Sequence, residues 1–221
     1  MARTKPVDPV LVVGLGRFGG ALAETLVGLG HEVLAVDTDA KRVQDYSGRL
    51  TSVVEANSTS ADALRQIGAA DFSRAVVAIG ADIEASILTV GALVDLGVQH
   101  VWAKAMTTAH GRILERVGAT RVVFPERDMG ERVAHMVTGR MLDYIELDEA
   151  FALVETVAPQ DLVGRTLGQT RVRHKHGVTV VCIKPPGGSF TYATAETLVD
   201  EGALLVVAGT CDRAERFAKM L

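Results

Sequence analysis

The sequence has few of the features that define several large protein classes. Among its 221 residues are only two cysteines, Cys182 and Cys211, and they lack the CxxC spacing of zinc and redox sites. We interpret them as reduced core thiols. No run of about 18 apolar residues occurs, which excludes a membrane-spanning helix. The segment from Met1 to Pro9 is polar and lacks the apolar stretch of a secretory signal, so we expect a cytoplasmic protein.

A surplus of positive charge is also absent. Lys and Arg together number 23 and Asp and Glu 27, which gives a formal charge of −4. Nucleic-acid-binding domains are usually basic, so we do not expect DNA or RNA as a partner. Hydrophobic residues make up 48% and charged residues 23% of the chain, which is typical of globular proteins and excludes a disordered chain.

Short β-branched runs alternate with longer segments of helical periodicity in the first part of the chain. One helical segment carries Phe18, Leu22 and Leu26 four residues apart. Because buried parallel strands read as continuous apolar runs, this alternation predicts a Rossmann-type, doubly wound α/β domain over residues 1–127. We expect its strands at Val10–Gly14, Val33–Asp37, Ser52–Glu55, Ala75–Ile79, His100–Lys104 and Arg121–Phe124.

After Pro125 the pattern changes. Apolar residues from Met129 to Tyr144 recur at helical spacing with charges opposite them, which predicts a crossover helix over residues 128–145. The apolar stripe fits a dimer contact or a core face within one chain. Residues 146–221 then predict a small C-terminal α+β domain. Its strands are expected at Leu153–Val157, Val178–Ile183 and Ala203–Ala208, and its closing helix at Asp212–Met220.

The strongest local motif is the glycine loop, Gly14-Leu15-Gly16-Arg17-Phe18-Gly19. It follows a strand, opens a helix, and is accompanied by an acidic residue, Asp37, at the end of the second strand. This is the context that a dinucleotide-binding fingerprint requires. Gly14 permits the tight turn, Gly16 lets phosphates approach the backbone, and Gly19 lets helix and strand pack closely. The helix N-terminus favours an anion, so the motif predicts a nucleotide site.

Side chains near the glycine loop refine this prediction. Asp37 suits ribose hydroxyls, and its charge would repel the 2′-phosphate of NADP. Its alternative role is to cap the next helix, which Asp39 fills equally well. Arg17 places a cation in the loop, which suits a ligand with several phosphate charges. We include Phe18 of the loop and Thr38, next to Asp37, among the candidate nucleotide contacts.

No catalytic constellation accompanies this site in the sequence. The six histidines are scattered, and the Walker lysine, GxSxG and HExxH motifs are missing. Asp82 and Glu84 follow the fourth strand at the ligand-binding edge, but they fit the first turn of the next helix equally well. The pattern indicates binding without catalysis, so we do not expect an enzyme. An NAD-dependent oxidoreductase is the alternative, because one fold hosts both functions.

The chain resembles the RCK regulatory subunits of bacterial Ktr and Trk potassium uptake systems. The motifs that carry this resemblance are the glycine loop, Val36-Asp37, Ala78-Ile79-Gly80, Trp102-Ala103-Lys104-Ala105 and Phe124-Pro125-Glu126-Arg127-Asp128-Met129-Gly130. It covers essentially the whole chain, as an N-terminal RCK domain, a crossover helix and a C-terminal RCK (TrkA-C) domain. A single copy of this arrangement resembles the Ktr branch rather than the tandem-repeat Trk subunit.

The resemblance implies a gating subunit that binds ATP, ADP or NAD(H) and controls potassium flux. Such subunits form homodimers that assemble into an octameric ring on a membrane potassium-transporting subunit, at the inner face of the membrane. By motif, the glycine loop and Arg17 would contact phosphates and Asp37 the ribose. Lys104 would lie near the terminal phosphate, and Asn57 would line the adenine pocket. A nucleotide sensor acting on a different channel or antiporter is a third hypothesis.

Two further sites are implied by the resemblance. Glu126 matches a carboxylate that meets its symmetry mate around a divalent cation, Mg²⁺ or Ca²⁺, both of which prefer oxygen ligands. On its own, Glu126 reads as a solvated acid after a proline. Arg173, in the basic segment Arg171–His176, lies near the position where some relatives bind cyclic di-AMP. A solvated basic turn is the alternative for that segment.

Overall fold

The computed structural model describes residues 8–137 and 141–220. The chain divides into two compact units, Met1–Glu126 and Arg127–Leu221. The division lies one residue before the expected domain end at residue 127. In the described part of the chain, no helix is both long enough and apolar enough to cross a membrane.

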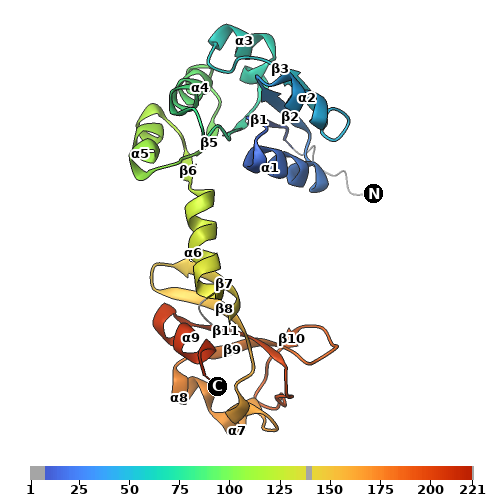
Figure 1. Cartoon of the computed structure of the whole chain (residues 1–221), viewed down its shortest axis with the longest axis vertical. Coiled ribbons are helices and arrows are strands. Elements are labelled where there is room, and N and C mark those ends of the chain that lie inside the picture. Colours follow the sequence, from blue (N-terminus) through green and yellow to red (C-terminus); the bar gives the residue numbers. More distant parts are fainter. Residues whose placement is uncertain (1–7, 138–140, 221) are drawn as a thin grey trace. The chain divides into compact units, whose positions relative to one another are not determined.

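The first unit contains a six-stranded parallel sheet in the order β3-β2-β1-β4-β5-β6, flanked by helices (Figure 1). This is the strand order of a doubly wound Rossmann fold, so the predicted fold class is confirmed. The strands are β1 (Val10–Val13), β2 (Val33–Asp37), β3 (Ser52–Glu55), β4 (Arg74–Val77), β5 (His100–Lys104) and β6 (Arg121–Val123). The helices are α1 (Arg17–Gly28), α2 (Ala40–Tyr46), α3 (Ala61–Gln66), the 3₁₀ turn η1 (Ala69–Asp71), α4 (Ile83–Asp95) and α5 (Thr108–Val117).

Three predicted strands extend slightly too far at their carboxyl ends. The observed strands stop at Val13, Val77 and Val123, and the residues that follow leave the sheet. These residues are apolar or small, so composition alone does not separate them from the strands. Their departure from the sheet builds the loops at the carboxyl edge, where doubly wound folds bind ligands.

The pleat of β1 sends its side chains into two separate cores. Val10 and Val12 belong to a cluster with Ala23 of α1, whereas Leu11 and Val13 belong to a second cluster with Val90 of α4. Alternate residues of a strand point to opposite faces, so the two clusters lie on the two faces of the sheet. Burial on both faces explains why the strands read as continuous apolar runs.

Helix α6 (Pro125–Val137) begins at a proline, which is favoured at the first helical position. It carries the exposed residues Met129, Val133 and Val137 four positions apart, on one stripe. The predicted helix over 128–145 is too long, because residues from Met141 onward form a strand, β7 (Met141–Asp148). Residues 138–140, inside that predicted helix, lie outside the described residues.

A β-bulge explains the error in helix length. Met141 and Tyr144 are both buried although they are three residues apart, a spacing that matches a helix and not a regular strand. The pairing of β7 with β8 (Phe151–Val157) shifts between Met141 and Asp143, and Leu142 is the additional residue. Because a bulge inserts one residue into the alternation, it imitated a continuation of the helical stripe.

The second unit contains a five-stranded antiparallel sheet in the order β10-β9-β11-β8-β7. This confirms the predicted small α+β unit, although β7, β10 and the short helices α7 and α8 were not predicted. The remaining elements are β9 (Thr179–Lys184), β10 (Thr191–Tyr192), β11 (Leu204–Thr210), the 3₁₀ turn η2 (Gln160–Leu162), α7 (Leu167–Thr170), α8 (Val172–His176) and α9 (Cys211–Ala218).

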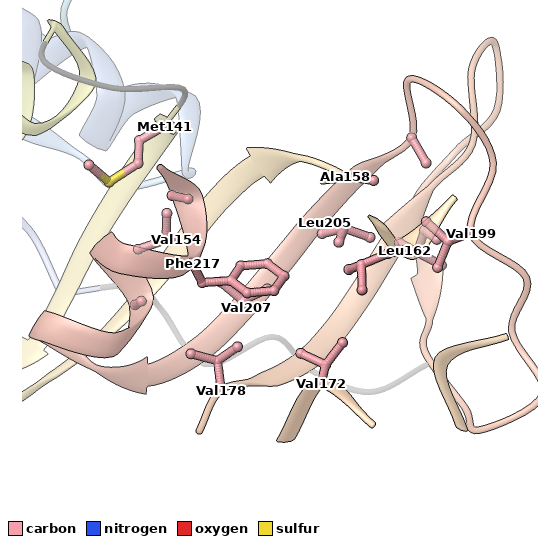
Figure 2. Packing of buried hydrophobic residues seen from close by; sticks show 14 of the residues in the cluster. Met141, Val154, Ala158, Leu162, Val172, Val178, Val199, Leu205, Val207 and Phe217 are labelled. Atoms are coloured by element: carbon pink, nitrogen blue, oxygen red, sulfur yellow. The ribbon is translucent and has the colours of Figure 1, made fainter. Parts of the chain in front are cut away.

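Helix α9 closes the core of this unit. Ala214, Phe217 and Ala218 are buried on one side of the helix, and Phe217 extends over the sheet beside Val207 of β11 (Figure 2). The two cysteines are free thiols, as predicted, but both are only partly buried and neither is a fully buried core residue.

Candidate functional site

A cleft of about 760 Å³ opens at the carboxyl edge of the parallel sheet, around the point between β1 and β4 where the strand order reverses. Ligands of doubly wound folds bind at this switch point. The cleft is lined by all the predicted nucleotide and metal residues except one, namely Gly14, Gly16, Arg17, Phe18, Asp37, Thr38, Asn57, Lys104 and Glu126. Gly19 is the exception.

The glycine loop is shaped by two glycines that cannot be replaced without moving backbone. Gly14 has φ +96°, and a Cβ there would lie 3.2 Å from the carbonyl carbon of Ala78 in the β4–α4 loop. A Cβ at Gly19 would collide with the carbonyl oxygen of Gly14 and lie 2.8 Å from Ala78 Cβ. Gly19 therefore serves the packing of α1 against the sheet edge, which is why it does not line the cleft.

Gly16 has a different environment from Gly14 and Gly19. It is the N-cap of α1, with φ −67°, and a Cβ added to it would meet no atom within 4 Å. In the described part of the chain, no side chain caps this helix. The first-turn N–H groups of a helix have no partners within the helix, and they carry the positive end of its dipole. The start of α1 therefore offers an open anion site.

Asp37, at the end of β2, ties the glycine loop to the β2–α2 loop. Its buried carboxylate accepts hydrogen bonds from the backbone N–H of Leu15 at 2.6 Å and of Asp39 at 2.9 Å. The Arg42 guanidinium lies 3.4 Å from the same carboxylate. A carboxylate offers about four acceptor positions, so one is left for a ribose hydroxyl. The capping role falls to Asp39, which accepts from the N–H groups of Lys41 and Arg42.

Arg42 is a residue of the cleft that the sequence did not single out. Its guanidinium lies 3.4 Å from Asp37 and 3.4 Å from Asp39, so it offsets part of the negative charge on the ribose side. In the sequence it reads only as part of the start of a helix after Asp39. Its place in the cleft depends on how α2 turns back toward β2, which no local pattern encodes.

Lys104, at the end of β5, is a cation fixed on the other side of the cleft. Its side chain is only 10% exposed, and its ammonium group donates a hydrogen bond to Glu126 at the start of α6, a side chain that is 56% exposed. The ammonium lies 5.7 Å from the ring centroid of Phe18. A Cβ at Gly80 would lie 3.2 Å from it, so a glycine at this position leaves room for the lysine.

The bond between these two residues sets the charge state of Glu126. The hydrogen bond from Lys104 lowers the pKa of Glu126 below its ordinary value, and the positive charges of Lys104 and Arg17 lower it further. Glu126 is therefore ionised at neutral pH and forms an ion pair with the ammonium group of Lys104. An incoming phosphate group would compete with Glu126 for this cation.

Asn57 and Asp82 line the cleft on two further loops. The side-chain oxygen of Asn57 accepts from the N–H of Thr59 at 3.0 Å and from its hydroxyl at 2.8 Å, which leaves the Asn57 amide group as a donor. Asp82 caps α4 by accepting from the N–H of Ala85 at 2.9 Å, and Glu84 lies in the first turn. Of the two roles weighed for Asp82, the structure displays the cap.

The described residues do not form a complete metal site. Within residues 8–137 and 141–220, no group of three His, Cys, Asp or Glu side chains is arranged to hold an ion. Glu126 offers a single carboxylate that is bonded to Lys104. Mg²⁺ and Ca²⁺ take about six to eight oxygen ligands, of which Glu126 would supply one or two, so the predicted metal role of Glu126 stays a prediction.

Arg173 lies in the second unit, on the one-turn helix α8. Its Nε donates a hydrogen bond to the hydroxyl of Thr179 at 2.9 Å. The side chain borders a cavity of about 620 Å³ that combines cations with apolar residues. Among the residues that line this cavity are Leu167, Arg171, Val172, His174 and Val180.

Comparison with known proteins places this chain among potassium uptake proteins. The TrkA-N domain family matches residues 10–125. The chain is 39% identical over 209 residues to Ktr system potassium uptake protein C of Bacillus subtilis, covering 94% of this chain and 95% of that protein. It is 37% identical over 207 residues to Ktr system potassium uptake protein A of the same organism, covering 93% of each.

Among solved structures, the fold resembles that of the GsuK channel bound to NAD, with a TM-score of 0.66 and 19% identity. The match covers 100% of this chain and 40% of the channel chain. At this identity the likeness concerns the fold alone. The match to the TrkA-N domain and the identity to the two Ktr proteins decide the family. The chain belongs to the TrkA-N family and is a homologue of the Ktr potassium uptake proteins.

Proposed function

We propose that this chain senses adenine nucleotides and thereby controls potassium flux through a membrane subunit, without catalysing a reaction. The observation that carries the proposal is the cleft itself. It places an open helix N-terminus, a ribose-type acid, Asp37, and a buried cation, Lys104, around one volume of about 760 Å³. The potassium uptake role of the two Bacillus subtilis relatives supports the transport function.

The arrangement suits a nucleotide with several phosphates. The α- and β-phosphates would lie against the first turn of α1, near the guanidinium of Arg17, and the ribose against Asp37. Asn57 would line the adenine side. This placement uses the residues whose geometry is open to a ligand and leaves Gly14 and Gly19 to shape the loop.

The Lys104–Glu126 pair offers a way to distinguish ATP from ADP. A terminal phosphate that reaches Lys104 replaces Glu126 as the partner of the ammonium, whereas ADP, one phosphate shorter, leaves the pair intact. Because Glu126 is the second residue of α6, this exchange would change the interactions at the start of the helix that leads into the second unit. A ligand shifts a conformational equilibrium only by its difference in affinity for the two states, and this exchange supplies such a difference.

NAD(H) is the alternative ligand of the same cleft, and the NAD-bound GsuK channel supports it at the level of the fold. An NAD-dependent oxidoreductase is the competing function. It would show substrate-dependent consumption of NADH and no effect on potassium flux.

Assembly is the second part of the proposal. The exposed stripe of Met129, Val133 and Val137 on α6 suits a homodimer contact, and such dimers would form an octameric ring at the cytoplasmic face of the membrane subunit. In a dimer, two copies of Glu126 brought together would repel each other unless a cation such as Mg²⁺ or Ca²⁺ lay between them. The proposed cation site therefore needs two chains.

Cyclic di-AMP is a candidate second ligand, in the cavity of about 620 Å³ beside Arg173. Its lining combines Arg171, Arg173 and His174 with the apolar residues Leu167 and Val180, which suits a ligand made of purines and phosphates. An affinity measurement with cyclic di-AMP, repeated on an Arg173→Gln variant, tests this assignment. Equal affinity in both proteins would remove it.

The transport proposal is tested by potassium flux. Proteoliposomes that hold a Ktr-type membrane subunit are mixed with this chain in the presence of ATP or ADP, and potassium uptake is measured. We expect faster uptake with ATP than with ADP, and no nucleotide dependence with a Gly16→Ala variant. Uptake that does not depend on the chain, or on the nucleotide, would overturn the proposal.

A further inference from the structure

A second basic cavity, of about 510 Å³, lies within the second unit between α8 and α9. It shares Arg173 and His174 with the cavity of about 620 Å³, whereas Lys175, His176, Arg213 and Arg216 line only the smaller one. Its full lining is Arg173, His174, Lys175, His176, Gly177, Arg213, Arg216, Phe217 and Met220, and none of these residues is acidic. We refer to it as the α8–α9 cavity.

The permanent cations of the α8–α9 cavity have no acidic partners. Throughout the part of the chain that the structure describes, no ion pair is formed by Arg173, Lys175, Arg213 or Arg216, and this in a chain with a net charge of −4. Like charges near one another repel, and residues three apart on a helix, such as Arg213 and Arg216, are neighbours. A bound anion would relieve this repulsion.

Helix α9 separates its charges between two sides. Glu215 is 3.4 Å from Lys219 and 3.5 Å from His135, so the acid is engaged by partners that do not line the α8–α9 cavity. Arg213 and Arg216 line the cavity instead. Without this separation, Glu215 would neutralise the neighbouring arginines. The helix therefore presents two uncompensated guanidinium groups to the cavity.

The side chain of Arg213 packs directly against the glycine that ends α8. Gly177, the C-cap of that helix, has φ +69°, and a Cβ there would lie 2.6 Å from Nη1 and 2.7 Å from Cδ of Arg213. A side chain at residue 177 would thus displace the guanidinium. The glycine both ends the helix and lets Arg213 pack directly on the turn.

His176 belongs to the wall of the α8–α9 cavity and packs against Phe217. Its Nε2 atom is buried and, in the described structure, has no hydrogen-bond partner. The ring meets Phe217 edge-on, with centroids 5.6 Å apart. Because this atom is shielded from solvent, the groups available to a ligand in the cavity are the Arg and Lys side chains.

We propose that the α8–α9 cavity binds a small ligand that carries two or more phosphate groups. Guanidinium groups bind phosphate oxygens through paired hydrogen bonds, and Lys adds further donors. A volume of about 510 Å³ lies within the range of small-molecule sites and exceeds what a single phosphate fills. The phosphates come either from a soluble phosphorylated compound or from a lipid headgroup.

The test uses inorganic tripolyphosphate as the probe and the full chain as the receptor. Tripolyphosphate is titrated calorimetrically into the nucleotide-free chain and into two double variants, whose difference isolates the α8–α9 cavity from the nucleotide cleft. We expect binding that weakens with added salt and that falls at least tenfold in an Arg213→Gln/Arg216→Gln variant. The control variant, Arg165→Gln/Lys184→Gln, removes the same charge from residues of the second unit that neither line the cavity nor pair with Glu215.

The outcomes distinguish a lipid headgroup from a soluble phosphorylated compound, and this inference from the nucleotide proposal. Competition by vesicles containing phosphatidylinositol bisphosphate, but not by phosphatidylcholine vesicles, assigns the phosphates to a lipid, and absence of competition assigns them to a soluble compound. Equal affinity of the two double variants, or no binding of tripolyphosphate or lipid to the unmodified chain, overturns the inference. Because ADP affinity is measured in the same samples, failure here is distinguishable from failure of the nucleotide proposal.

Discussion

Replacing Gly16 by alanine separates the binding role of the glycine loop from its structural role. Gly16 has φ −67°, a conformation open to alanine, and its added Cβ would meet no protein atom within 4 Å. The methyl group would instead occupy the space at the start of α1, where we place the phosphates. The variant should therefore fold normally and bind nucleotide poorly.

The expected change in stability is small because two effects oppose each other. Alanine reduces the conformational freedom of the unfolded chain, which stabilises the fold by about 0.4–1 kcal/mol. Alanine is also a poorer N-cap than glycine, which costs about 0.5–1 kcal/mol at this position. The free energy of unfolding should therefore change by less than about 0.5 kcal/mol. The ADP affinity should fall at least tenfold, or about 1.4 kcal/mol, because the methyl group keeps the phosphates from the backbone.

The measurements are urea unfolding and calorimetric titration with ADP on three proteins. The matched control is Gly28→Ala at the last residue of α1, where an added Cβ likewise meets no atom within 4 Å and lies outside the cleft. This control should gain about 0.5–1 kcal/mol in stability and bind ADP like the unmodified chain. A Gly16→Ala protein with unchanged ADP affinity, or one that is strongly destabilised, would refute the reasoning.

Three further predictions address packing, charge and the independence of the units. Gly19→Ala should lower the free energy of unfolding by about 2–3 kcal/mol in urea titrations, since its Cβ collides with the backbone of Gly14; unchanged stability would contradict the packing role. The Lys104 bond lowers the pKa of Glu126, so part of the stability of the first unit is present above pH 4.5 and is lost as the pH falls through the lowered pKa. Because Glu126 is more than half exposed, this contribution to the free energy of unfolding is below about 1 kcal/mol. Urea unfolding at pH 6 and pH 3 should show the contribution in the unmodified chain and not in a Glu126→Gln variant. The same change in stability between the two pH values in both proteins would exclude it. Phe217→Ala should destabilise the second unit by about 3–5 kcal/mol but leave the ADP affinity of the first unit unchanged; a loss of ADP binding would mean that the cleft depends on the second unit.

The sequence predicted the first unit well because burial on both faces makes each strand a continuous apolar run. It failed at β7, where the bulge at Leu142 gave Met141 and Tyr144 a helical spacing. The short helices α7 and α8 were missed for another reason. Each has four or five residues, too few to establish a periodic pattern.

The same contrast holds for the sites. The glycine loop is a single loop, and Asp37 ends the next strand at a fixed spacing from it, so the motif predicted where they would lie. Arg42 enters the cleft only through the turn of α2, and Arg213 reaches the basic segment Arg171–His176 only when α9 folds against α8. The sequence therefore showed a basic turn, and folding makes it one wall of a cavity.

The central claim is that Lys104 distinguishes ATP from ADP in a cleft built by the glycine loop. It is tested most directly by calorimetric titration of nucleotide-free protein with ATP and ADP, before and after a Lys104→Gln substitution. We predict that both nucleotides bind the unmodified chain and that the substitution weakens ATP by at least tenfold more than ADP. Equal losses for both nucleotides, or no binding of either to the unmodified chain, would contradict the account.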